Sequence, residues 1–249
     1  PLERGIKKLE RKNIYVLVVS GNHDFNIIKK LDQNIESEYF HLLGEEGKWE
    51  SRIISKNNQE LLEIIGWSYP RQRIHQNPLQ NINIKNKKIP GVGIIHAEMN
   101  NPSSYYAPVT QEELKEVPLT GWILGHIHQH FLINDPFSFI LNPGSPLPLN
   151  PGEPGKHLVW EIIIKAQDSY EINQYKLSPL SYSRINIDIS QLENIEKITS
   201  LISSKLRKKL EKEDFLSKNR LILVRLSLSG KTGFSREIEE IKDQIQEEL

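Results

Sequence analysis

The chain has 249 residues and a hydrophobic content of 37%, which is enough for one large domain or two modest ones, each with a core. Its formal net charge is zero at pH 7, so no whole-protein field attracts nucleic acid or acidic membranes, and such binding would need local basic patches. There is no cysteine, and no apolar run approaches the ~20 residues of a membrane span, which excludes disulfides, thiolate ligands and a spanning helix and leads us to expect a cytoplasmic protein.

Up to residue 178 the pattern predicts short strands joined by loops, with few helices. Strands are expected at 14–19, 50–55, 60–66, 92–95, 122–124, 137–141, 158–164 and 170–177. Helices are expected at 1–12, at 26–33, and from the cap Thr110, with Glu113 as its capping-box partner, to about Val117. Unbroken apolar runs among the strands are typical of buried parallel strands.

The pattern changes after residue 178, which predicts a second domain. The expected elements there are strands at 185–189 and 222–228 and helices at 192–210 and 238–245. Ser190 is the expected N-cap of the first helix. We therefore expect a domain at 1–178 and a small α+β domain at 179–249.

Three predicted strands deliver polar residues at their carboxyl ends. The strand at 14–19 runs into Gly21-Asn22-His23-Asp24, the strand at 92–95 into His96, and the strand at 122–124 into Gly125-His126-Ile127-His128. Open α/β sheets bind ligands just beyond such ends. A turn, a core histidine or a pair of surface histidines would explain each feature alone. The three together indicate one metal site assembled from distant parts of the chain.

Imidazole nitrogen and amide oxygen suit divalent cations such as Mn, Fe and Zn. An Asn makes more sense in a two-metal hydrolytic site than in a structural one, because cations ~3.5–4 Å apart can clamp the attacking and leaving oxygens of a phosphoester. We therefore expect two divalent metal ions, Mn first, with Fe or Zn as alternatives.

These residues resemble the third, fourth and fifth motifs of the calcineurin-like metallophosphoesterases. The metal ligands that the resemblance implies are Asn22, His96 and His126 for one ion and His128 for the other. It also implies that His23 acts beside the scissile phosphate, as general acid or as a donor to the developing charge, and that Asp24 accepts a hydrogen bond from His23. The implied fold is a two-sheet sandwich flanked by helices (αββα).

Further segments resemble the SbcD-type DNA repair exonucleases, including the YhaO-like proteins. They are 106–108, 124–129, 142–146, 153–156 and 158–159. This resemblance implies a nuclease domain at 1–178, a DNA-capping α+β domain at 179–249, and DNA ends as substrate. It implies a coiled-coil ATPase of the SbcC type or a second copy of the chain as partner, and no membrane.

Two motifs of the family are missing. The family carries an Asp-x-His after its first strand and a Gly-Asp after its second, and these supply the remaining ligands, including the carboxylate that bridges both metals. Both precede the Asn-His motif, and only 20 residues stand before Gly21. We therefore expect the sequence to be a window cut from a longer protein, with a nuclease domain that lacks its first strands.

Local basic and aromatic groups give modest support for nucleic-acid binding. Basic clusters stand at Lys85, Lys87 and Lys88 and at Lys205, Arg207, Lys208, Lys209 and Lys212, although a solvated helix face explains the second cluster better. Trp67, Tyr69, Arg71 and Arg73 combine aromatic and basic groups near the expected site. Base stacking and loop packing are equal alternatives for these four.

The leading hypothesis is a metal-dependent phosphodiesterase, an exonuclease or endonuclease subunit that acts on DNA ends in repair. One rival is a metallophosphoesterase for a small nucleotide or a phosphoprotein. The domain after residue 179 argues against it, because a minimal phosphatase would not need one. The other rival is a non-catalytic scaffold or DNA-binding subunit, supported by the missing aspartates.

Because no carboxylate in the predicted metal shell offsets the charge of the cations, we predict that the 249 residues alone are weakly active or inactive. Hydrolysis of a nitrophenyl phosphodiester with Mn²⁺ present measures this. A fully active site in the same residues would contradict the prediction.

Overall fold

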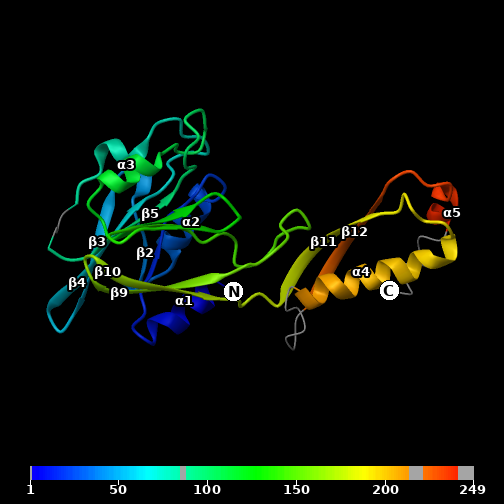
Figure 1. Ribbon diagram of the computed structural model, residues 1–249. Helices are drawn as coiled ribbons and strands as arrows, with labels where there is room; N and C mark the ends of the chain where they lie inside the picture. The colour runs from blue at the N-terminus through cyan, green and yellow to red at the C-terminus, as the bar shows by residue number, and fades with distance from the viewer. Residues whose placement is uncertain (1, 85–87, 213–220, 241–249) are drawn as a thin grey trace. The chain divides into compact units, whose positions relative to one another are not determined.

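The computed structural model describes residues 2–84, 88–212 and 221–240 (Figure 1). The chain forms two compact units. Unit 1 comprises Pro1–Ser145 and Val159–Tyr175, and unit 2 comprises Pro146–Leu158 and Lys176–Leu249. The assignment of nuclease and capping roles to the two parts of the chain stays a prediction.

A six-stranded mixed sheet forms the centre of unit 1. Its strands, in spatial order, are β3 (Glu50–Lys56), β4 (Gln59–Trp67), β5 (Gly91–His96), β6 (Gly121–Gly125), β8 (Phe139–Asn142) and β7 (Phe131–Asn134). The four inner strands run parallel, and β3 and β7 pair antiparallel at the two edges. Burial on both faces explains the unbroken apolar runs of β5 and β6, and the predicted strands there are confirmed.

Smaller elements surround this sheet. They are the parallel pair β1 (Val16–Val18) and β2 (Phe40–Leu42), the hairpin β9 (Val159–Ala166) and β10 (Ser169–Tyr175), the helices α1 (Leu2–Glu10), α2 (Phe25–Asn34) and α3 (Gln111–Glu116), and the 3-10 turns η1 (Glu45–Gly47) and η2 (Pro78–Asn81). The capping box of Thr110 and Glu113 begins α3, as predicted. Within the described ranges, no helix is both long and apolar enough to cross a bilayer.

Apolar layers cover both faces of the central sheet. On one face, Phe139 of β8 packs in a cluster with Trp160 of the β9–β10 hairpin. On the other, the buried Trp122 of β6 donates its indole N–H to the carbonyl of Leu114 in α3, at 2.8 Å. A third cluster joins α1, α2, β1 and β2. This layering confirms the predicted mixed α+β sandwich fold.

Unit 2 is built on two strands and a helix. Strands β11 (Leu180–Asp188) and β12 (Leu221–Ser229) pair in parallel, and α4 (Ile198–Lys212) packs on one face of the pair through a cluster that includes Ile187 and Ile202. The turn η3 (Ile195–Lys197) precedes α4, and α5 (Ser235–Glu240) follows β12. The rest of the helix predicted at 238–245, from 241 on, lies outside the described residues.

Ser190 is not a helix cap, so that prediction is wrong. Its backbone N–H and hydroxyl both donate to Asp188 Oδ1, at 2.9 and 2.6 Å, which closes a turn instead. Asn194 supplies the cap, because its side chain accepts from the backbone N–H of Glu196 at 2.9 Å and starts η3. Strands β2 and β7 were not predicted, since three and four residues are too few to show a period.

Gly93 of β5 is required for the close approach of Trp122, because a Cβ at Gly93 would lie 2.2 Å from the indole ring. We predict that Gly93→Ala destabilises the fold by ~1–3 kcal/mol through overpacking. A Cβ at Gly5 in α1 would meet nothing within 4 Å, so Gly5→Ala should be neutral or stabilising by ~0.5–1 kcal/mol. Urea unfolding measures both, and a Gly93→Ala chain as stable as the parent would contradict the prediction.

Candidate functional site

The parallel pairing of β5 and β6 brings their carboxyl ends to one edge of the sheet, with His96 opposite Gly125 in register. His126 therefore follows directly beside His96. The turn after β1 reaches the same place, because Asn22 Oδ1 lies 2.8 Å from His96 Nε2 although the two residues are 74 positions apart. Asn22, His96 and His126 are thus brought together.

The His96 ring lies in a narrow space between Gly21 and Gly125. A Cβ at Gly21 or Gly125 would lie 2.6 or 2.7 Å from His96 Nδ1, so only glycine allows both segments to approach the ring. Asn22 beside it is 3% exposed. Burial, helped by the nearby His126, His23 and His128, lowers the pKa of His96 to about 4. The imidazole is therefore neutral near pH 7 and offers a lone pair.

His126 has a strained backbone. Its φ is +89°, in the left-handed region that favours glycine, and such a conformation costs ~1–3 kcal/mol for other residues. Its ring lies 5.3 Å from the His96 ring and 4.5 Å from the Tyr106 ring, centroid to centroid. Burial lowers its pKa as well. Strain of this kind is found at functional sites and aims the imidazole at His96.

Glu98 places a carboxylate at the site that the sequence analysis missed. Its Oε2 lies 3.8 Å from His126 Nε2. Asn101 donates to its Oε1 at 3.0 Å and the Ser104 hydroxyl donates to its Oε2, and these bonds lower the pKa of Glu98. The available signal was the His-x-Glu spacing at the end of β5, since residues two apart on an extended segment share a face.

Hydrogen bonds from Asn142 of β8 fix the loop that carries His128. The Asn142 amide is buried and donates to the carbonyls of Ile127 and Gln129, both at 2.8 Å. The backbone N–H of Ser145 donates to the carbonyl of His128 at 2.9 Å. His128 itself is exposed. It lowers the pKa of both His96 and His126, which places it within electrostatic reach of the two rings.

His23 is exposed at the start of α2 and also lowers the pKa of His96 and His126. Asp24 accepts a hydrogen bond from the backbone N–H of Gly21 through Oδ1, at 2.6 Å. Among the described residues, no hydrogen bond joins His23 to Asp24. Asp24 therefore shapes the turn that carries Asn22, and its predicted role toward His23 stays a prediction.

The donors at this edge suit a divalent cation in kind, because they are one amide oxygen and neutral imidazole nitrogens. They do not form a complete shell. Among the residues that the structure describes, no three His, Asp or Glu side chains are arranged to hold a metal ion. Asn22 Oδ1 and His96 Nε2, the two atoms that would face a cation, point at each other.

No family model matches the chain. A curated protein, the uncharacterized metallophosphoesterase YhaO of Bacillus subtilis (strain 168), is 22% identical over 216 residues, which are 84% of this chain and 52% of that protein. The chain thus spans about half the length of this relative. The distant similarity supports the metallophosphoesterase superfamily and, in general terms, hydrolysis that uses divalent metals.

The lowered pKa of His96 has a consequence for stability. Between its ordinary value of 6.5 and about 4, the unfolded chain binds a proton there that the folded chain does not. The contribution of neutral His96 to the free energy of unfolding is therefore fully present above pH 6.5. It is lost as the pH falls toward 4, by up to ~3 kcal/mol. We predict that His96→Gln reduces this loss in urea unfolding in metal-free buffer, whereas His75→Gln, at an exposed histidine, does not. The same loss in the His96→Gln chain and the parent would contradict the prediction.

Proposed function

We propose that the chain is the phosphodiesterase part of a metal-dependent nuclease that cleaves DNA ends in repair. Asn22, His96 and His126 would bind one divalent ion and His128 a second. The observation that carries the proposal is the 2.8 Å contact between Asn22 and His96, which joins the ends of two distant strands beside His126. The similarity to a metallophosphoesterase supports the same chemistry.

Bound divalent ions would supply a nucleophilic water near neutral pH and offset charge on the phosphate. Mn²⁺ is the expected ion, and Fe or Zn would suit the same donors. His96 and His126, with lowered pKa values, would stay neutral and keep their lone pairs for a metal. His23 would donate to the leaving oxygen or to a phosphate oxygen. Glu98 would orient His126 as a charged neighbour.

An arginine pair in unit 2 supports a polyanionic substrate. Arg184 of β11 stands opposite Arg225 of β12 in register, and both are exposed. Among the described residues neither has an acidic partner; Arg184 Nε donates to the Pro151 carbonyl at 3.3 Å. Like charges directly opposite each other destabilise a sheet, and phosphates would offset that cost. The half-buried Tyr182 and the exposed Leu223 opposite it add an apolar strip beside the pair.

The predicted basic clusters add little to this support. Lys205, Arg207 and Lys208 are exposed on α4, which suits the solvated-face alternative equally well. The side chains of Lys209 and Lys212 are not described, and Lys85 and Lys87 lie outside the described residues. The proposed partners, a coiled-coil ATPase of the SbcC type or a second copy of the chain, rest on the family resemblance alone.

The test uses the protein with any residues encoded before Pro1, assayed with Mn²⁺ on linear duplex DNA and on a nitrophenyl phosphodiester. We expect cleavage of both, abolished by EDTA. His126→Gln should lower the rate by at least about 100-fold, since loss of even an outer partner of a metal site costs 10–100-fold. His130→Gln is the matched control, because His130 packs on Trp160, with ring centroids 5.8 Å apart, and has no proposed role.

Two outcomes would contradict the proposal. Cleavage of the small ester with none of DNA would favour a phosphoesterase for small substrates. No metal-dependent cleavage of either substrate by a folded protein would favour a scaffold or DNA-binding subunit.

A further inference from the structure

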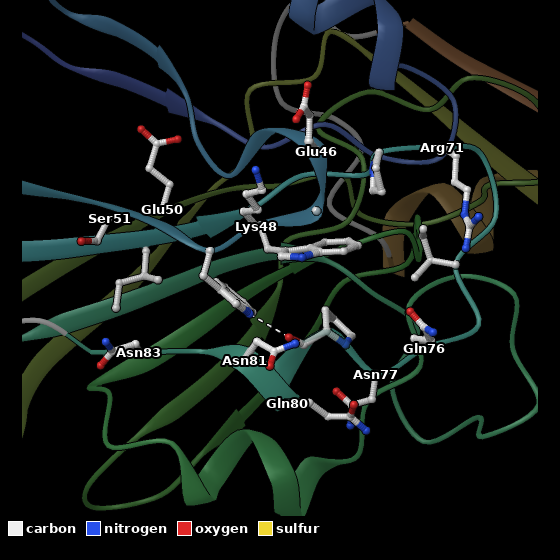
Figure 2. A pocket seen from close by; sticks show the side chains of 17 residues that line it. Glu46, Lys48, Glu50, Ser51, Arg71, Gln76, Asn77, Gln80, Asn81 and Asn83 are labelled. Atoms are coloured by element: carbon white, nitrogen blue, oxygen red, sulfur yellow. Dashed lines mark hydrogen bonds between the residues drawn. The ribbon is translucent and has the colours of Figure 1, made fainter.

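Unit 1 contains a pocket of about 670 Å³ that includes none of the predicted metal ligands but is lined by Trp67 and Arg71 (Figure 2). It is bounded by β3, β4 and the chain segments at 46–49 and 70–83. This volume lies in the range of small-molecule sites, ~300–1,000 Å³. Its lining has an unusual composition, with two tryptophans and five amide side chains.

The amides come from one segment that crosses the pocket. They are Gln76, Asn77, Gln80, Asn81 and Asn83, and Figure 2 shows Asn77, Gln80 and Asn81 gathered along one wall. Asn77 Oδ1 accepts from the backbone N–H of Leu79 at 2.9 Å, a bond that leaves the NH₂ group of Asn77 for a ligand. In the described part of the chain, Gln76, Gln80 and Asn81 make no side-chain hydrogen bond. Each of these amides can therefore offer a donor and an acceptor to a ligand.

The tryptophans give the pocket a fixed aromatic lining. The Trp49 indole N–H donates to the carbonyl of Pro78 at 2.7 Å, which ties the amide segment to the ring. Trp49 also makes an edge contact with the buried Trp122, at 5.9 Å between ring centroids. Trp67 is 5% exposed and is held in the core. A rigid aromatic lining of this kind suits a flat ligand.

The pocket lining carries two carboxylates, Glu46 and Glu50, and two cations, Lys48 and Arg71. Glu50 Oε2 accepts from the backbone N–H of Gly44 at 3.0 Å, and Glu46 lies 3.6 Å from Lys29 Nζ. Arg71 and Lys48 line the same pocket and have no ion-pair partner among the described residues. The two carboxylates are thus engaged, while the two cations are available to a ligand.

We infer that this pocket binds a nucleobase together with its sugar phosphate; the inference rests on the proposed function and adds a subsite to it. Amide side chains match the paired donors and acceptors on base edges. Unstacked bases pack on aromatic and guanidinium planes, and a phosphate would pair with Arg71 or Lys48. An uncharged sugar would use the amides but leave the two cations without a partner.

The pocket adjoins the candidate metal site through Tyr69. The Tyr69 ring makes edge contacts with Trp67 at 5.5 Å and with His96 at 5.4 Å between centroids. Its hydroxyl is buried and has no hydrogen-bond partner among the described residues. Tyr69 and Trp67 are 2% and 5% exposed, so this connection runs through the packed core. A strand base and a free nucleotide carry the same chemistry, and the titrations below distinguish the two sources.

The test is calorimetric titration with dAMP and with a short single-stranded oligonucleotide, in EDTA so that no metal contributes. We expect saturable binding. It should weaken at least about tenfold in Arg71→Ala and in the double variant Gln76→Ala/Asn81→Ala, as for the loss of one good base contact or more. Arg11→Ala and Gln174→Ala are matched controls, since both residues are exposed and lie outside the pocket lining, and these variants should bind as the parent does.

The same titrations identify the source of the bound base. Stronger binding of the oligonucleotide than of its abasic counterpart indicates a base of a strand. Equal binding of dAMP and the oligonucleotide indicates a free nucleotide. Three results would overturn the inference: no saturable binding of either ligand, equal weakening in the controls, or equal binding of maltose. A parent protein that binds neither ligand but still shows metal-dependent cleavage would overturn this inference alone. A parent protein that binds the ligands but does not cleave would overturn only the proposed function.

Discussion

The structure of the site depends on the seating of one imidazole, His96, between Gly21 and Gly125. The parallel register of β5 and β6 sets His96 opposite Gly125, and the turn after β1 can then close on the ring only because position 21 has no Cβ. That closure places Asn22 Oδ1 2.8 Å from His96 Nε2 and leaves the ring partly buried. Burial in turn keeps His96 neutral. A side chain at either glycine would push the segments apart and break the contact between Asn22 and His96.

The surrounding elements keep the residues next to His96 in place. Asn142 fixes the loop behind His126 through two backbone carbonyls. The strained φ of His126 costs ~1–3 kcal/mol and is sustained by that loop and by the Tyr106 ring. Tyr69 connects His96 to Trp67, so the same core that seats the imidazole also forms the lining of the amide-rich pocket. The candidate metal site and the pocket therefore share one packed layer.

The sequence predicted the elements whose signals are local. The apolar runs of β5 and β6, the capping box at Thr110 and the polar residues at the strand ends all follow from neighbouring residues. Ser190 failed because Asp188, two positions earlier, competes for its hydrogen bonds. Glu98 and the amide side chains of the pocket were missed for a different reason, although Trp67 and Arg71 of the same pocket were noted. Glu98 matters through its approach to His126, and the pocket needs β3, β4 and the segment at 70–83 together, so both are set by tertiary packing.

The most direct test of the central claim is a Mn²⁺ titration of the chain followed by the ring resonances of its eight histidines. A paramagnetic ion broadens the signals of the nuclei nearest to it. If Asn22, His96, His126 and His128 gather around divalent ions, the signals of His96, His126 and His128, with that of nearby His23, will broaden together at the lowest Mn²⁺ concentrations, before those of His41, His75 and His157. Broadening that starts at one of these three, or that spreads evenly over all eight, would contradict the account.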